Sequence, residues 1–295
     1  MPANNPARPP ALAECIVQSF IVAYKEDTSA LEHALREEGL PVEVLRPHYT
    51  QQELTYSRAI RCLLNHASAW RRAREAGGMT LIVEADFVPC VGLGRMPLPF
   101  DPQLHGDAGW AFLYSAGPRM FQCHPDGGLQ GHSCTSVAYV VSPRVAGWLT
   151  EYVEEELVRN LDLTQYSLWD TQFQWHVMGK GGKCFMPYRN FGEHGGIPNK
   201  EHFRERVGFA ARLRFLGRMG IGLNHYADVL HGRLKFLPAY AGGSRAKFFR
   251  TRLEGKVIGC LKLLAGRVVA AEKSLSPREK LYLRWICLKR LCAFH

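Results

Sequence analysis

Two acidic residues, Glu84 and Asp86, follow a short apolar run and are separated by a single alanine. Because side chains alternate along a strand, the two carboxylates can point in the same direction. Paired hard oxygen ligands at the end of a strand suit Mg²⁺ or Mn²⁺, either of which can bridge a diphosphate. The plain alternative is a pair of solvated acids at a strand terminus.

Four other side chains have the chemistry of a reactive site. His66 lies at the edge of the apolar stripe of an expected helix, where the alternative is a hydrogen-bonded core histidine. Asp170 lies among aromatic residues, where it is either a functional carboxylate or a simple charge at a helix N-terminus. Glu193 and His194 are flanked by glycines, which let a backbone approach a ligand closely, and this favours a functional loop.

The segments around these residues follow an α/β pattern. Apolar, β-branched runs predict strands at residues 15–24, 42–45 and 79–86, and helical periodicity predicts helices at residues 27–38 and 57–76. This alternation predicts an α/β fold with a mostly parallel sheet. Ligands of such sheets bind beyond the carboxyl ends of the strands, which is where the two acids lie.

The pattern continues through the second third of the chain. Further strands are expected at residues 110–115, 136–141 and 184–187, with helices at residues 143–158 and 169–178. The glycine-rich segment 190–199 is expected to be a loop. The remaining residues are basic and mostly helical in pattern.

The composition is that of a folded protein. Of the 295 residues, 46% are hydrophobic and 22% are charged, which excludes a mostly disordered chain. The sequence has no uncharged apolar run long enough for a membrane-spanning helix, so we expect none. The nine cysteines include no Cys-x-x-Cys pair, and we expect reduced thiols in a cytoplasmic protein.

The net charge of +10 lies entirely in the last third of the chain. Residues 1–199 carry a net charge of −5 and residues 200–295 a net charge of +15. Residues 1–12, which begin with a Pro- and Asn-rich segment, are expected to be a flexible tail. The charge asymmetry predicts a near-neutral globular domain (13–200) and a basic helical C-terminal region (201–295). The basic excess favours an anionic partner, such as nucleic acid, a phosphorylated small molecule or a membrane surface.

Two apolar stripes at helical spacing run through the basic C-terminal region. They consist of Val257, Leu261, Leu264 and Val268, and of Leu281, Trp285, Leu288 and Cys292. One interpretation is a pair of helices that pack on the globular domain with their charges solvated. The other is an interfacial arm that holds the protein peripherally on the anionic inner face of the cytoplasmic membrane.

Taken in order, the motifs of residues 15–195 resemble glycosyltransferase family 25, the lipopolysaccharide-biosynthesis glycosyltransferases. The matching run is Cys62-Leu-Leu-Asn-His66, followed by Ala69-Trp70 and by a strand that ends Glu84-Ala-Asp86. Later, Thr135-Ser-Val-Ala-Tyr-Val-Val-Ser142 looks like a strand of the family, and Asp170 looks like its downstream acid. The basic C-terminal region lies outside the resemblance.

The resemblance implies a Rossmann-like, GT-A type domain that transfers a sugar from a UDP-sugar, with galactose favoured. The implied acceptor is lipopolysaccharide or another surface glycan, carried as a lipid-linked oligosaccharide. Glu84 and Asp86 would hold Mn²⁺ or Mg²⁺, with His194 as a third ligand or as a contact of the diphosphate. An inverting transfer needs a carboxylate to take the proton of the acceptor hydroxyl, and Asp170 is the first candidate and Glu193 the second.

The donor side of such a site is expected at the end of the first strand. The residues expected to contact the nucleotide sugar are Val22, Tyr24, Lys25, Arg61 and His66. The first two would lie against the nucleotide base, and the two cations can reach phosphate.

Two other interpretations stay open. Ala85 stands where the family has a central acid, and Asn65 where it has a serine, so the chain could be an inactive relative that binds glycan or scaffolds other transferases. A nucleic-acid-binding protein is disfavoured, because the basic region has no known motif and few aromatic residues regularly interleaved with its charges.

Overall fold

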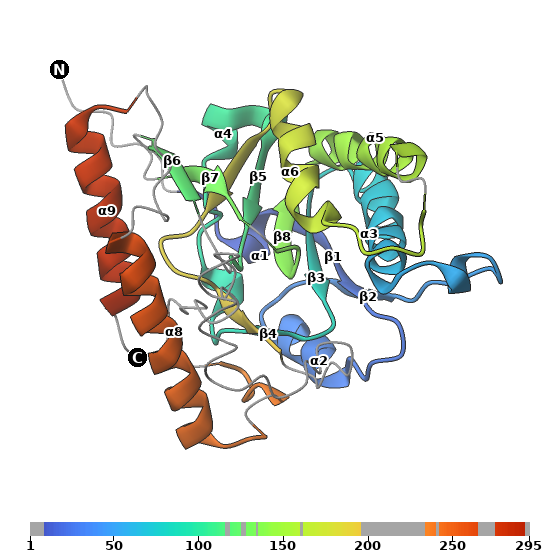
Figure 1. Cartoon of the computed structure of the whole chain (residues 1–295), viewed down its shortest axis with the longest axis horizontal. Coiled ribbons are helices and arrows are strands. Elements are labelled where there is room, and N and C mark those ends of the chain that lie inside the picture. Colours follow the sequence, from blue (N-terminus) through green and yellow to red (C-terminus); the bar gives the residue numbers. More distant parts are fainter. Residues whose placement is uncertain are drawn as a thin grey trace.

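A computed structural model describes residues 9–115, 119–124, 128–133, 135–159, 162–195, 234–239, 242–264 and 275–292. Its centre is an eight-stranded sheet with helices on both faces (Figure 1). The strands are β1 (Ile16–Val22), β2 (Val42–Leu45), β3 (Met79–Glu84), β5 (Gly109–Phe112), β6 (Arg119–Cys123), β7 (Leu129–His132), β8 (Ala138–Val141) and β9 (Lys183–Met186).

The strand order is β2-β1-β3-β8-β5-β9-β7-β6, and six of these eight strands run in the same direction. β8 and β7 run the opposite way, so each pairs antiparallel with both of its neighbours. The prediction of an α/β fold with a mostly parallel sheet is confirmed, and the arrangement is compatible with a Rossmann-like fold.

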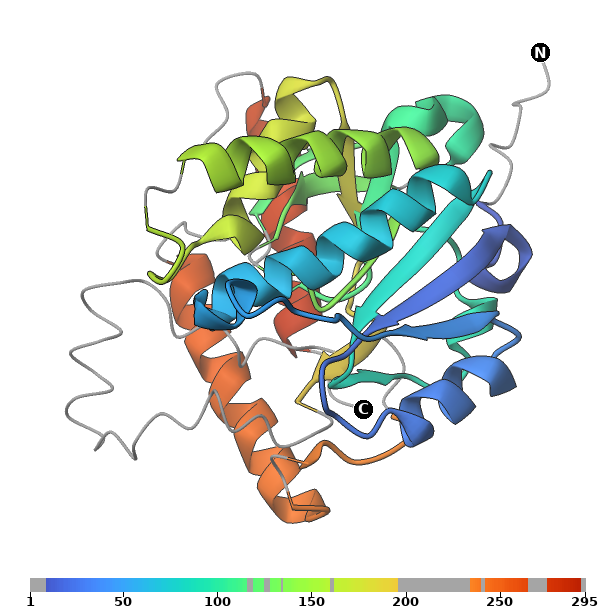
Figure 2. The ribbon, with the colours of Figure 1, turned by 90° about the vertical axis from the view of Figure 1, so that its right-hand side faces the viewer.

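Helices cover the sheet in two layers. They are α1 (Leu12–Cys15), α2 (Ser29–Glu37), α3 (Arg58–Glu75), α4 (Pro102–His105), α5 (Pro143–Arg159), α6 (Trp169–Gly179), α8 (Arg245–Leu264) and α9 (Pro277–Cys292), with single 3₁₀ turns at Glu53–Thr55, Leu93–Arg95 and Gly106–Ala108. Figure 2 shows α3 and α5 side by side across one face of the sheet.

Alternation along the strands explains why both faces of the sheet are covered. Phe20 and Ile82 belong to the apolar cluster under α3, α5 and α6, whereas Ile21 and Leu81 belong to the cluster that includes Leu31 of α2. Consecutive residues of β1 and β3 therefore enter opposite layers, as the pleat of a strand requires. A strand buried on both faces reads as a continuous apolar run, which is how β1 and β3 appear in the sequence.

A two-stranded ribbon lies beyond the carboxyl end of β3. β4 (Phe87–Pro89) pairs antiparallel with β10 (Gly192–His194), and backbone hydrogen bonds from Cys90 to Phe191 and from Gly195 to Asp86 extend the pairing. A Cβ atom on Gly192 would lie 2.3 Å from the ring of Phe87, so only glycine permits this approach. The expectation of a loop across residues 190–199 is therefore corrected at β10, and residues 196–199 lie outside the described residues.

Both ends of the globular domain depart from the expected boundaries. Leu12, which the sequence places in the flexible tail, is fully buried, and its backbone N–H donates to the Met96 carbonyl. Residues 1–8 lie outside the described residues. In the basic C-terminal region, Leu234 forms a β-bridge with Cys90, and Lys235 lies 2.9 Å from a carboxylate oxygen of Glu38. Leu234 and Lys235 of that region therefore contact the globular domain.

Helix α9 packs on the edge of the sheet with a face that the sequence did not indicate. Leu283, Ile286 and Cys287 are buried in a cluster with Met120 of β6 and Met186 of β9. The expected stripe faces outward, and its members Leu281, Trp285, Leu288 and Cys292 are exposed. Among the described residues, no helix has the length and apolar character needed to cross a membrane.

Candidate functional site

The candidate site lies at the edge of the sheet where β1 and β3 end. These strands are parallel, and their register places Val22 beside Glu84. One residue further on, the Ala85 backbone N–H donates to the Val22 carbonyl. The side chain of Ala85 belongs to the apolar cluster on the α2 face, whereas those of Glu84 and Asp86 are the predicted ligands.

The ribbon of β4 and β10 brings His194 to Asp86. His194 Nε2 lies 2.9 Å from Asp86 Oδ2, and the imidazole ring lies 5.9 Å from the ring of Tyr114. Burial alone would lower the pKa of His194, but the charge and hydrogen bond of Asp86 raise it to about 9. Without a metal, His194 is therefore an imidazolium at neutral pH.

Three side chains that the sequence assigned to a metal site come together here. Glu84, Asp86 and His194 each offer one ligand atom, and these atoms lie within 4.8 Å of one another. Asp86 Oδ1 is buried and has no hydrogen-bond partner among the described residues, so this oxygen can accept a ligand. Two carboxylates and an imidazole are a donor set that fits a divalent cation such as Mn²⁺.

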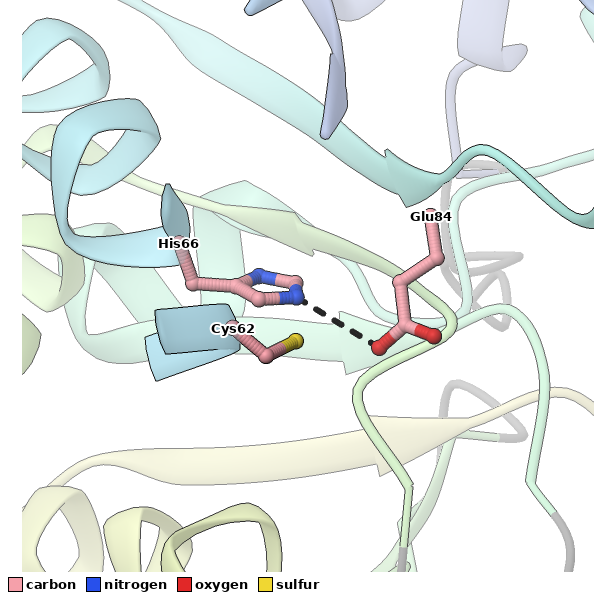
Figure 3. A group of neighbouring side chains, drawn as sticks. All are labelled: Cys62, His66 and Glu84. Carbon is pink, nitrogen blue, oxygen red and sulfur yellow. Dashed lines mark ion pairs between the residues drawn. The ribbon is translucent and has the colours of Figure 1, made fainter. Parts of the chain in front are cut away.

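Glu84 also faces a second group of potential ligands. Cys62 and His66 project from α3 toward Glu84, as Figure 3 shows, and their ligand atoms lie within 4.8 Å of a Glu84 oxygen. Glu84 Oε1 lies 3.4 Å from His66 Nε2 and accepts a hydrogen bond of 2.7 Å from the Ser136 hydroxyl. Burial alone would raise the pKa of Glu84, but His66, His194 and Ser136 hold it at about 2.

His66 is held in place by a buried chain of hydrogen bonds. Trp70 Nε1 donates to the Tyr139 hydroxyl at 2.8 Å, and that hydroxyl lies 2.8 Å from His66 Nδ1. Because an indole N–H can only donate, the Tyr139 oxygen accepts it and is free to give its own proton to Nδ1. This assignment leaves Nε2 protonated and directed at Glu84. His66 is thus both the buried histidine of the plain interpretation and a contact of the candidate site.

Asp170 lies in the first turn of α6 and interacts electrostatically with Glu84. Burial and the negative charge of Glu84 raise the pKa of Asp170 to about 6. Its Oδ1 atom is buried and has no hydrogen-bond partner among the described residues. The neighbouring Trp169 fixes the start of α6, since its indole N–H donates to the Ala59 carbonyl and its ring lies 5.2 Å from that of His66.

Glu193 has a different environment from Asp170. It is 2% exposed, and its Oε1 atom lies 4.0 Å from Nε of Arg252 on α8. Neighbouring side chains of a strand point to opposite faces, so Glu193 and His194 face opposite sides of β10. The geometry therefore connects His194 to the acidic cluster and Glu193 to α8.

The expected donor-binding residues lie at the end of β1 and the start of α3. Val22 is buried in the sheet, while Tyr24 is half-buried with its ring 5.5 Å from that of Tyr49. The guanidinium of Arg61 lies over the Tyr49 ring at 5.9 Å, and the ammonium of exposed Lys25 lies over the Tyr24 ring at 4.8 Å. Two aromatic rings and two cations thus gather at one end of the sheet.

Several residues of this site were not identified from the sequence. Tyr49 lies in a segment without a periodic pattern, so nothing marked it. Ser136 and Tyr139 lie in the segment that supports the family resemblance, but their spacing does not indicate a contact with Glu84 or His66. Asn65 donates a hydrogen bond of 2.9 Å to the Ala23 carbonyl, which ties α3 to the end of β1.

Comparison with known proteins adds no relative: no model of a protein family matches the sequence, and no curated protein matches it.

Proposed function

We propose that this protein is a glycosyltransferase of the GT-A type, similar to family 25, that moves a sugar from a UDP-sugar to a lipopolysaccharide or other surface-glycan acceptor. Galactose is the favoured sugar. The observation that carries the proposal is that ligand atoms of Glu84, Asp86 and His194 come together at the carboxyl edge of the sheet. Asp170 lies near them, since burial and the charge of Glu84 raise its pKa. This edge is where α/β sheets bind their ligands.

The acidic cluster would act on the diphosphate leaving group. Glu84, Asp86 and His194 would hold Mn²⁺ or Mg²⁺, which when bound neutralises charge on the diphosphate. The unpartnered Oδ1 of Asp86 supports this role. Tyr24 and Tyr49 offer ring faces for the uracil base, and Arg61 offers a cation for phosphate.

Asp170 is the proposed general base of an inverting transfer. Its carboxylate takes the proton of the acceptor hydroxyl while that oxygen forms a bond to the anomeric carbon. The bond from this carbon to the diphosphate oxygen breaks, and its electron pair leaves with UDP. A pKa raised to about 6 brings the base closer to neutrality, where proton transfer is most efficient. Glu193 is the weaker candidate, because Arg252 lies against it.

The alternative of an inactive relative rests on Ala85, which replaces an acid of the family motif. The Ala85 side chain lies in the apolar cluster on the α2 face, away from the carboxylates of its two neighbours. The presence of alanine instead of an acid at position 85 therefore removes no ligand from the proposed cluster. This placement favours an active enzyme over a binding or scaffold protein.

The proposal is tested by measuring UDP release from UDP-galactose, UDP-glucose and UDP-N-acetylglucosamine with Mn²⁺. We expect slow donor hydrolysis that is abolished by EDTA and by Asp86→Asn. Asp107→Asn is the matched control, because Asp107 is an exposed acid that forms an ion pair with Arg144. Tight UDP binding without turnover of any donor would instead indicate the inactive relative.

A further inference from the structure

Among the described side chains of α8, two cations face inward and a row of apolar residues faces outward. Arg252 and Lys256 are only 9% and 7% exposed, and Arg252 lies against buried Glu193. Burying cations carries a desolvation cost, and lysine and arginine are rarely buried at all. An ordinary surface helix turns its apolar face to the core, so this orientation needs another reason.

The described side chains on the outward face of α8 include an apolar row from Phe249 to Leu264. Its members and their exposed fractions are Phe249 (57%), Leu253 (43%), Val257 (54%), Leu261 (62%) and Leu264 (84%). Spacings of three and four residues place them on one side of the helix. In Figures 1 and 2, α8 lies at the margin of the molecule, with α9 beside it.

Exposed cations accompany the apolar row. Arg245, Lys247 and Arg250 are exposed near the start of α8. Helix α9, which packs against α8, adds exposed Arg278, Arg284 and Lys289, together with half-exposed Tyr282 and Trp285. Among the side chains described on these two helices, Glu279 is the single acid.

We propose that α8 is a membrane-docking helix that lies in the surface of an anionic lipid bilayer. Its apolar row would enter the acyl boundary, and the exposed cations would meet lipid phosphates at the anionic surface. A second copy of the chain is a poorer occupant, because joining two such rows would bring like charges together. The proposal is independent of the glycosyltransferase activity.

The test is co-sedimentation of the full chain with vesicles of phosphatidylcholine, with and without phosphatidylglycerol. We expect binding to the anionic vesicles alone, with release as the salt concentration rises. The double variant Val257→Glu, Leu261→Glu should bind these vesicles roughly tenfold or more weakly, because charge replaces inserted apolar area. Both positions are exposed, so the fold should survive, and circular dichroism checks this.

The matched control is the double variant Val158→Glu, Leu168→Glu, which charges two equally exposed apolar residues elsewhere (82% and 52% exposed). It should bind vesicles like the natural sequence. Leu261→Trp gives a second readout, since its emission should shift to the blue on anionic vesicles and not on neutral ones. Unchanged vesicle binding by the Val257→Glu, Leu261→Glu variant would overturn the proposal. So would a natural protein that binds no vesicles but sediments as a dimer, if this variant sediments as a monomer.

Discussion

His194 lies against Asp86 because β10 pairs with β4, which continues directly from Asp86. This pairing joins a histidine near the end of the globular domain to an acid at the end of β3. The contact closes the acidic cluster on one side, and α3 with His66 closes it on the other.

His194→Ala should weaken Mn²⁺ binding by roughly tenfold or more, because it removes one of three converging ligand atoms. Isothermal titration calorimetry of the purified chain measures this affinity without any donor or acceptor. His33→Ala is the control, since His33 is an exposed histidine on α2. Equal Mn²⁺ affinity in all three proteins would show that His194 is not a ligand and would leave it as a contact of the diphosphate.

Asp170→Asn should lower turnover by roughly 10²-fold or more while leaving UDP affinity unchanged, as expected for loss of a general base. Steady-state rates and UDP titration on the same protein separate the two effects. Full activity of this variant would transfer the base role to Glu193. Loss of UDP affinity would instead make Asp170 a donor-binding residue.

The pH dependence of stability should change in the same variant. The pKa of Asp170 is raised to about 6 in the folded protein, so between its ordinary value and about 6 the folded chain binds more protons than the unfolded chain. Stability from this group is therefore present at low pH and is lost as the pH rises through about 6. Between about pH 5 and about pH 8, the natural protein should lose about 1–2 kcal/mol more of its unfolding free energy than Asp170→Asn. Urea unfolding of both proteins at the two pH values gives this difference. An equal change of unfolding free energy in the two proteins would contradict a buried, ionised Asp170.

Tyr139→Phe should destabilise the fold by roughly 1–3 kcal/mol, because it leaves the buried N–H of Trp70 without an acceptor and His66 Nδ1 without its partner. Urea denaturation measures the change. Tyr166→Phe, at a tyrosine that is 72% exposed, should change stability by less than about 0.5 kcal/mol. Similar small effects at both positions would mean that the hydroxyl of Tyr139 does not anchor His66.

Strong periodic patterns predicted the central elements well. The expected strand at residues 42–45 is β2, and the helix expected at residues 57–76 is α3, whose N-cap Ser57 accepts from the Ile60 N–H. Strands β6 (Arg119–Cys123) and β7 (Leu129–His132) were missed, because polar residues interrupt their apolar pattern and β7 depends on pairing with the distant β9. β10 was missed for a related reason, since pairing with β4 outweighs the loop preference of its glycines.

The candidate site was only partly accessible from the sequence. The position of Glu84 and Asp86 at the end of a strand follows from the apolar run before them. The approach of His194 depends on the tertiary pairing of β10, which no local spacing reveals. In α8, the stripe of Val257 and Leu261 indicated which residues share a face, but a stripe does not say whether that face meets the core or the solvent.

The pairing of β4 with β10 also determines when the candidate site can be completed during synthesis. Synthesis proceeds from the N-terminus, so a growing chain can form β1 and β3 long before the ribosome delivers β10. During that interval the carboxyl edge of the sheet holds Glu84 and Asp86 without His194, whereas His66, which lies 3.4 Å from Glu84 in the complete protein, is already part of the chain. The arrival of His194 neutralises that edge, so the acidic cluster is completed by one of the last segments of the domain to be made.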